Sequence, residues 1–193
     1  MILSSRNEHK VRELGEILPG SDLRALPDEV ILPPETGTTF EENALIKARA
    51  ARAATGEVVI ADDSGLEVDA LGGRPGVYSA RYAGEDATDG ENLERVLADL
   101  AGAVGGEGSG TARYVCVIAL IDDEGEHLFR GTCEGRLIQE PRGDGGFGYD
   151  PAFIPEATGP GDDRTMAELS PAEKNAISHR GAAANLLAAH LPG

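Results

Sequence analysis

The sequence predicts a single α/β domain over residues 1–193, built on a mixed central sheet flanked by helices. Two patterns indicate this fold. Short apolar runs typical of strands alternate with amphipathic stretches typical of helices, and two long strand-like stretches are joined by a short turn, as in a hairpin. A chain of 193 residues can bury a core that needs no disulfide bonds.

The N-terminal region predicts a short buried strand over residues 1–5 and a helix over about 7–18. Pro19-Gly20 is expected to end this helix. Next comes the Ala-rich stretch to Ala54, which predicts a second helix because Thr39 and Glu42 have the spacing of a capping box. Gly56 is expected to terminate it.

The run Val58-Val59-Ile60-Ala61 is continuously apolar, as expected of a strand buried on both faces. We expect it to deliver Asp62-Asp63-Ser64-Gly65 at its C-terminal end. Residues 72–90 are rich in loop formers, and Asp89 is a candidate cap for a helix through Leu100. The Gly-rich stretch 102–110 is expected to be a surface connection.

Residues 114–121 and 126–138 predict paired strands joined by the turn at 122–125. The two cysteines, Cys116 and Cys133, lie within these strands without CxxC spacing, which favours small buried residues over a disulfide or metal pair. After a second Gly-rich loop, the segment Ser170-Pro171-Ala172-Glu173 predicts a capped helix start, and helical structure is expected to continue to the C-terminus.

Net charge sets a condition on function. The chain carries 17 Lys and Arg against 34 Asp and Glu, a formal net charge of −17. Such a surface repels nucleic-acid backbones and anionic membranes, so neither is an expected partner. There is no 18-residue apolar stretch and no signal-peptide pattern, so cytoplasm is the expected location. Any phosphate site must carry local cations or a divalent metal.

The first candidate segment lies between the first strand and the first helix. Backbone N–H groups at a helix start, with a lysine nearby, attract phosphate. The alternative is that a side chain here only caps the helix and that the lysine is solvated. The segment consists of Ser5, Arg6, Asn7, Glu8, His9 and Lys10.

The second candidate segment joins Glu35 to the Asp62-Asp63-Ser64-Gly65 run. Adjacent carboxylates after a buried strand are costly unless a cation or hydrogen bonds compensate them. Mg²⁺ prefers a few carboxylates together with phosphate oxygens and water. The alternative is an Asx turn that ends the strand.

The third candidate is the Gly-rich loop 143–150, which contains Phe147, Gly148, Tyr149 and Asp150. Glycines let a ligand approach the backbone, and an exposed ring offers a base a stacking surface. The alternative is that both aromatic residues belong to the core.

The fourth candidate places three potential cations, Lys174, His179 and Arg180, within seven residues. On one regular helix Lys174 and His179 would lie about 140° apart. All three can therefore face one ligand only if the helix breaks, with Ser178 as the cap of the restarted helix.

Five stretches together resemble the inosine triphosphate pyrophosphatase family, the XTP/dITP diphosphatases. They are SRNEHKVREL (5–14), ETGTTFEENALIKARAA (35–51), ADDSGLEVDALGGRPGVYSARYAGEDATD (61–89), GGFGYDPAFIP (145–155) and AELSPAEKNAISHRGAA (167–183). They run in family order over nearly the whole chain, and their combination is highly specific. The resemblance implies an elongated sheet, two lobes with an active-site cleft between them, and a homodimer.

The resemblance also implies a reaction: Mg²⁺-dependent hydrolysis of dITP, ITP and XTP to the nucleoside monophosphate and pyrophosphate, which cleanses the nucleotide pool. Carried over by motif, the segment from Ser5 to Lys10 would hold phosphates. Glu35 and Asp63 would bind the metal, and Asp63 would act as the base for the attacking water. Ser64 would contact the substrate.

For the base, the resemblance implies a pocket formed by Phe147, Gly148, Tyr149 and Asp150, with Phe147 stacked on the purine. Lys174 would bind the nucleotide, and His179 and Arg180 would read the 6-oxo group.

Two features depart from the family pattern: a longer and more acidic stretch at 156–164, and Arg6 where many relatives have a small residue. Two other functions remain open, a pyrophosphatase for other modified bases and a nucleotide-binding module that does not cleave.

Overall fold

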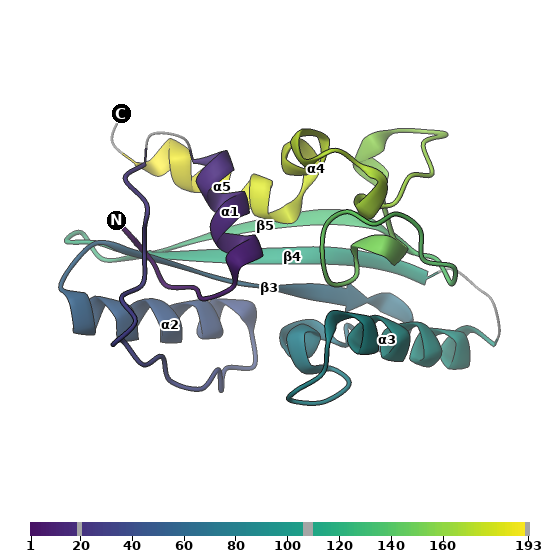
Figure 1. Cartoon of the computed structure of the whole chain (residues 1–193), viewed down its shortest axis with the longest axis horizontal. Coiled ribbons are helices and arrows are strands. Elements are labelled where there is room, and N and C mark those ends of the chain that lie inside the picture. Colours follow the sequence, from purple (N-terminus) through teal and green to yellow (C-terminus); the bar gives the residue numbers. More distant parts are fainter. Residues whose placement is uncertain (19–20, 106–109, 192–193) are drawn as a thin grey trace. The chain divides into compact units, whose positions relative to one another are not determined.

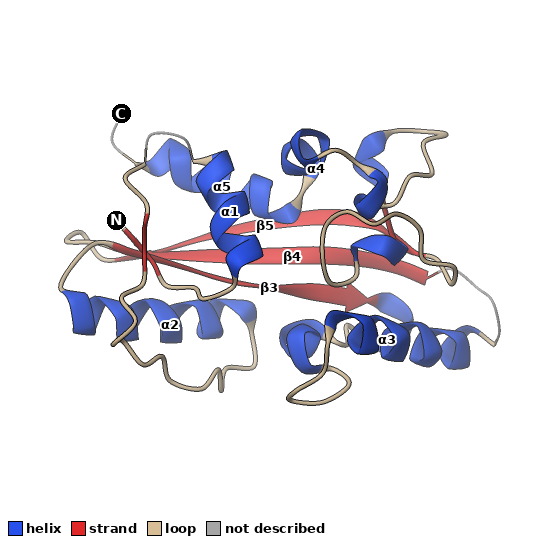
Figure 2. Ribbon diagram, viewed as in Figure 1, coloured by secondary structure: helices blue, strands red, loops and turns tan. Residues whose placement is uncertain are grey.

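The computed structural model describes residues 1–18, 21–105 and 110–191 and confirms the mixed α/β fold (Figure 2). Six strands form one sheet in the order β2-β1-β3-β4-β5-β6. The predicted helix end at Pro19-Gly20 and residues 106–109 of the predicted Gly-rich connection lie outside the described residues.

The strands are β1 (Ile2–Leu3), β2 (Arg24–Ala25), β3 (Val59–Val68), β4 (Gly110–Ile121), β5 (Glu126–Leu137) and β6 (Phe153–Pro155). The helices are α1 (Glu8–Ile17), α2 (Phe40–Thr55), α3 (Asp89–Val104), α4 (Pro171–Ile177) and α5 (His179–His190).

The chain divides into two compact units that are interleaved along the sequence. The first unit comprises Met1–Ser64, Cys116–Gly131 and His179–Gly193, and the second comprises Gly65–Val115 and Thr132–Ser178. Strands β3, β4 and β5 contribute residues to both units. Each unit has its own apolar core.

In the first unit, β1 lies between β2 and β3 and is parallel to both. Helices α1 and α5, which lie near opposite ends of the sequence, pack together (Figure 1). They cover a core that includes Leu3, Ile60 and Ile118. Helix α2 begins at the predicted capping box of Thr39 and Glu42 and ends at Gly56, which has φ of 70°. Both predicted ends of this helix are confirmed.

In the second unit, α3 packs its apolar face on a core that contains Leu66, Tyr114 and Phe153. The predicted cap of this helix was wrong. Thr88, not Asp89, is the N-cap, because its hydroxyl accepts from the Glu91 backbone N–H in a capping box. The predicted strand pair over β4 and β5 is confirmed, and β6 pairs antiparallel with β5.

Strand β3 differs from its predicted course. It does not end before Asp62 but continues through Asp63 and Ser64 to Val68. On one side it pairs with β1 only at Val59 and Ile60, whereas on the other side the 12-residue β4 runs beside it. Successive residues of a strand point to opposite faces of the sheet, so the two aspartates are separated by the backbone.

The predicted helix break is confirmed: α4 ends at Ile177, and Ser178 has an extended backbone with φ of −73° and ψ of 154° before α5 begins. The predicted start of α4 is also confirmed, since Ser170 and Glu173 form a capping box. Both cysteines are buried and free, as predicted. In the described part of the chain, no helix is long and apolar enough to cross a bilayer.

Candidate active site

The three lysines of the chain belong to two groups of candidate site residues, one in each unit. The sequence has 14 arginines but only three lysines, Lys10, Lys47 and Lys174. Each lysine has a side chain at most 15% exposed and lies within 3.1 Å of a carboxylate oxygen. Lys10 and Lys47 belong to the first unit and Lys174 belongs to the second.

On one face of β3, Asp62 is held between helices α1 and α5. Its Oδ2 lies 3.0 Å from Lys10 Nζ and 3.6 Å from the Arg180 guanidinium. Arg180 is 1% exposed, forms an ion pair with Glu13 of α1 and donates to Ser64 Oγ at 3.0 Å. Burial raises the pKa of Asp62, but the nearby cations outweigh burial and hold this pKa well below its usual value. Asp62 is therefore a fixed negative charge.

On the opposite face of β3, Asp63 and Glu35 share the ammonium of Lys47 in α2. Lys47 Nζ lies 2.6 Å from Glu35 Oε1 and 3.1 Å from Asp63 Oδ1. Burial raises the pKa of Asp63, and Glu35 adds to the rise although Lys47 and Lys10 oppose it. The pKa of Lys47 is itself raised, because three carboxylates outweigh its burial. One shared cation therefore does not neutralise this pair.

Three buried carboxylate oxygens of β3 lack a hydrogen-bond partner among the described residues: Asp62 Oδ1, Asp62 Oδ2 and Asp63 Oδ2. Of these, Asp62 Oδ2 forms ion pairs with Lys10 and Arg180. Four carboxylates, those of Glu13, Glu35, Asp62 and Asp63, face three cations in this cluster. An unpartnered buried carboxylate oxygen beside excess negative charge suits a hard divalent cation such as Mg²⁺.

The loop that carries Glu35 is fixed by the start of α2. Asn43 Oδ1 accepts from the Gly37 backbone N–H at 2.8 Å, and the Glu42 carboxylate accepts from the backbone of Thr38 and Thr39. A Cβ atom at Gly37 would lie 2.6 Å from the Glu42 Cβ, so this position has no room for a side chain. The capping box that starts α2 thus also positions Glu35.

The start of α1 shows how the first candidate segment is built. Asn7 is the N-cap and accepts from the backbone N–H groups of His9 and Lys10. Ser5 Oγ accepts from the Asn7 N–H at 3.3 Å. The Arg6 guanidinium donates to the carbonyls of Asp28 and Val30 at 3.1 and 2.8 Å.

Two further members of that segment, Glu8 and His9, lie in the first turn of α1. Glu8 is the first residue of α1, and His9 is exposed with its Nδ1 3.4 Å from Arg12.

In the second unit, the buried Asp150 organises the Gly-rich loop. Its Oδ2 accepts from Lys174 Nζ at 2.7 Å and from the Phe147 backbone N–H at 2.9 Å, and its Oδ1 accepts from the Tyr114 hydroxyl at 3.1 Å. A Cβ atom at Gly146, where φ is 72°, would lie 2.1 Å from Asp150 Oδ2. Glycine is therefore required there.

Phe147 and Tyr149 have different surroundings in this loop. The ring of Phe147 is half-buried, and Lys174 Nζ lies 4.9 Å from its centroid. Tyr149 belongs to the core, and its hydroxyl donates to the Ser79 carbonyl at 2.6 Å. The Gly148 N–H donates to the Asp89 carboxylate at 2.9 Å. Of the two rings, only Phe147 is placed to offer a face to a ligand.

Comparison with known proteins shows the family of the chain. A model of the Ham1 family matches residues 1–190. The chain belongs to the Ham1 family. A relative from Mycobacterium tuberculosis (strain H37Rv) is named dITP/XTP pyrophosphatase; it is 52% identical over 194 residues, with 97% of this chain and 92% of the relative covered. A Bacillus licheniformis relative of the same name is 48% identical, with 99% of this chain and 97% of the relative covered.

Solved Ham1 structures have the same fold. A HAM1 protein from Coxiella burnetii superposes with a TM-score of 0.86 at 45% sequence identity, covering 98% of this chain and 96% of that chain. The Ham1 protein of Staphylococcus aureus gives a TM-score of 0.84 at 41% identity over 98% of this chain and 96% of that chain.

For this Ham1 member, the sequence prediction omitted Lys47. A signal was present: Lys47 shares a helix face with Asn43, Ala44, Ala48 and Ala51, all of which are buried. A lysine on a buried helix face requires a carboxylate partner. Glu13 was also omitted from the predicted site, and Asp62 was part of the second candidate segment but was given no role, because their partners come from distant parts of the chain.

The structure distributes the predicted cation cluster over both units. Lys174 contacts Asp150 in the second unit, whereas His179 and Arg180 begin α5 in the first. His179 is buried. Its backbone carbonyl packs against Gly131 of β5, where an added Cβ atom would lie 2.2 Å from the carbonyl oxygen.

Proposed function

We propose that this chain hydrolyses the deaminated purine nucleoside triphosphates dITP, ITP and XTP to the nucleoside monophosphate and pyrophosphate. Two relatives that are named dITP/XTP pyrophosphatase match at least 97% of the chain. The observation that carries the proposal is the pairing of Asp63 and Glu35 on Lys47, with Asp63 Oδ2 buried and unpartnered among the described residues.

Asp63 is the proposed base. A raised pKa makes its carboxylate a better proton acceptor than an ordinary aspartate, which suits a general base near neutral pH. Water would attack a phosphorus atom that is bonded to the oxygen bridging the α- and β-phosphates. Asp63 Oδ2 would take a proton from this water as the water oxygen bonds to the phosphorus. The bond between the phosphorus and the bridging oxygen would break, giving the monophosphate and pyrophosphate.

Glu35 and Asp63 are the proposed Mg²⁺ ligands, since both are carboxylates and together they exceed the charge of Lys47. When bound, Mg²⁺ would offset negative charge on the phosphate oxygens. Lys47 keeps the two carboxylates together, and Lys10 and Arg180 keep Asp62 ionised on the other face of β3.

The start of α1 is the proposed phosphate contact, because its first N–H groups carry partial positive charge and Lys10 lies in the same turn. Phe147 would stack on the purine, an interaction worth about 1–3 kcal/mol. Lys174, held by Asp150 beside the ring, would bind the nucleotide.

Selection for deaminated purines has a simple physical basis. Hypoxanthine and xanthine present an acceptor oxygen at position 6, whereas adenine presents a donor amino group. A buried N–H donor facing adenine would be left unpaired, at a cost of about 1–3 kcal/mol, which is about 5- to 150-fold in rate. His179 and Arg180 stay the predicted donors, and Arg180 is engaged by Glu13 and Ser64 in the first unit.

A substrate panel tests the proposal. Purified protein with Mg²⁺ should release pyrophosphate from dITP, ITP and XTP, and far less from dATP and dGTP. Equal turnover of all five, or release of orthophosphate, would reject the specific assignment. Turnover confined to other modified bases would support the broader pyrophosphatase, and tight ITP binding without product would support a binding module.

A substitution tests the catalytic residue. Asp63→Asn should abolish pyrophosphate release while the far-UV circular dichroism stays unchanged. Glu67→Gln is the matched control: it removes the same charge on the same strand, where Glu67 lies 3.8 Å from Arg113. If Asp63→Asn keeps as much activity as the control, Asp63 is not the base.

We also propose that the protein works as a cytoplasmic homodimer. Light scattering after size exclusion should give a mass near twice 20.1 kDa, and a monomeric mass would reject the dimer.

A further inference from the structure

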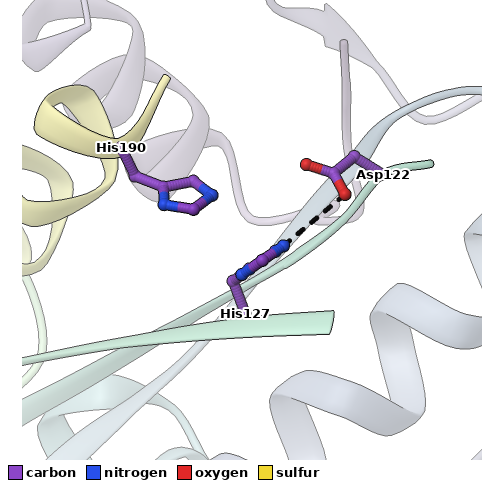
Figure 3. A group of neighbouring side chains, drawn as sticks. All are labelled: Asp122, His127 and His190. Carbon is purple, nitrogen blue, oxygen red and sulfur yellow. Dashed lines mark ion pairs between the residues drawn. The ribbon is translucent and has the colours of Figure 1, made fainter. Parts of the chain in front are cut away.

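Two of the four histidines of the chain meet a carboxylate at one end of the first unit. Asp122 begins the turn between β4 and β5, His127 follows in β5, and His190 is the last residue of α5 (Figure 3). None of these residues belongs to the Asp62–Asp63 cluster, and none has a role in the proposed reaction.

The three side chains are spaced closely enough for one metal ion. One ligand atom from each lies within 4.8 Å of the others, and His127 Nε2 is 3.6 Å from Asp122 Oδ1. Tetrahedral zinc with bonds of about 2.0–2.1 Å separates its ligand atoms by about 3.4 Å. The 3.6 Å between Asp122 Oδ1 and His127 Nε2 already approaches this value. Rotation of the His190 side chain would bring its ring nitrogen to a similar distance from both atoms.

The existing contacts leave the Nε2 atom of His127 available as a ligand. Among the described residues, His127 Nε2 is buried without a hydrogen-bond partner, and the 3.6 Å to Asp122 exceeds hydrogen-bond range. Asp122 Oδ1 accepts from the backbone N–H groups of Glu124 and Gly125, at 2.8 and 3.0 Å, which fixes the carboxylate in the turn. The rings of His127 and His190 are 4.4 Å apart between centroids.

The surroundings also favour a cation. His190 ends α5, and the C-terminal end of a helix carries partial negative charge from its last carbonyls. The net charge of −17 raises the local concentration of cations at the surface. Imidazole ligands select zinc and similar transition metals over Mg²⁺, which prefers oxygen ligands.

We propose that Asp122, His127 and His190 bind a divalent transition-metal ion of the zinc type. This site is separate from the proposed Mg²⁺ site and differs from it in ligand chemistry. The ion would link the β4–β5 turn to the end of α5, two segments more than 60 residues apart in sequence. Such a link stabilises the folded first unit, because the unfolded chain does not hold the three ligands together.

Zinc titration tests the site. The full chain would be titrated with Zn²⁺ in excess Mg²⁺, with bound zinc counted after separation and thermal unfolding followed in parallel. At zinc concentrations about 100-fold above Kd, the Tm should rise by about 5–10 °C. His127→Gln and His190→Gln should each weaken binding by at least about 100-fold, since loss of even an outer partner of a ligand costs 10–100-fold.

Asp123→Asn is the matched control, because it removes a carboxylate from the same turn. The Asp123 carboxylate pairs with Arg52 and is not one of the three proposed ligands. It should bind zinc and gain Tm as the unmodified chain does. In EDTA, the Tm should be nearly the same for all variants. If His127→Gln proves unstable, His190→Gln still tests the site, because His190 is exposed at the end of α5. Undiminished zinc binding by His190→Gln, or no zinc binding by the unmodified chain, would overturn the proposal.

Discussion

Replacing Lys47 by methionine would remove the cation that Glu35 and Asp63 share while keeping a side chain of similar length. Lys47 lies 2.6 Å from Glu35 and 3.1 Å from Asp63, and its side chain is 9% exposed. The substitution leaves two carboxylates close together, with Asp63 only 8% exposed. We expect the folded protein to be destabilised and the proposed metal site to be altered.

Breaking a buried ion pair by removing one partner costs about 3–5 kcal/mol. Glu35 is 28% exposed, so water relieves part of the repulsion, and about 3–4 kcal/mol is the expected loss of unfolding free energy. For a chain of this size each kcal/mol lowers Tm by about 2–4 °C, which gives a decrease of about 6–16 °C.

Differential scanning calorimetry in EDTA measures this loss, with Arg49→Met as the control. Arg49 lies on the same helix and pairs with Glu126, but its side chain is 57% exposed, so its loss should cost at most about 1 kcal/mol. The same scans should be repeated over a range of pH.

The effect of pH has a defined sign. Burial already raises the folded-state pKa of Asp63, and removing Lys47 should raise it further. The folded state then binds more protons than the unfolded state, so the stability of Lys47→Met should recover as pH falls from neutral toward 4. A Tm equal to that of Arg49→Met, or a deficit that grows at acid pH, would refute the reasoning.

Three other substitutions and one labelling experiment follow from the contacts. Tyr114→Phe removes the hydroxyl that donates to Asp150, a hydrogen bond to a charged group worth about 1.5–3 kcal/mol, measurable by urea unfolding. Gly131→Ala should lower Tm sharply, because its Cβ would lie 2.2 Å from the His179 carbonyl. Gly15→Ala should instead stabilise the chain by about 0.5–1 kcal/mol, since α1 has open space there. Burial raises the pKa of both thiols to about 12, so neither cysteine should react with a thiol reagent at pH 8 until the protein unfolds; rapid labelling of the native chain would contradict this burial.

Structure that depends on neighbours along the chain was predicted from the sequence. The capping boxes at Thr39–Glu42 and Ser170–Glu173, and the helix break at Ser178, are found where they were expected. Each depends on hydrogen bonds or backbone angles within about four residues, so the sequence contains both partners of the interaction. The same holds for the strand pair around the 122–125 turn.

The full length of β3 was not predicted, because pairing with β4 extends that strand through Asp62 and Asp63. The extension determines the chemistry: adjacent strand residues point to opposite faces, so Asp62 pairs with Lys10 and Asp63 pairs with Lys47. Tertiary contacts, and not local sequence, determine which lysine pairs with each aspartate.

The sequence by itself therefore determined the fold class, most helix ends and the segments that carry the candidate site. The tertiary structure decided which charges meet. Pairs such as Arg180 with Glu13, and the Asp122, His127 and His190 cluster, join residues from opposite ends of the chain or from separate elements. Their energies depend on burial and on distances of a few Å, and neither quantity is encoded in local spacing.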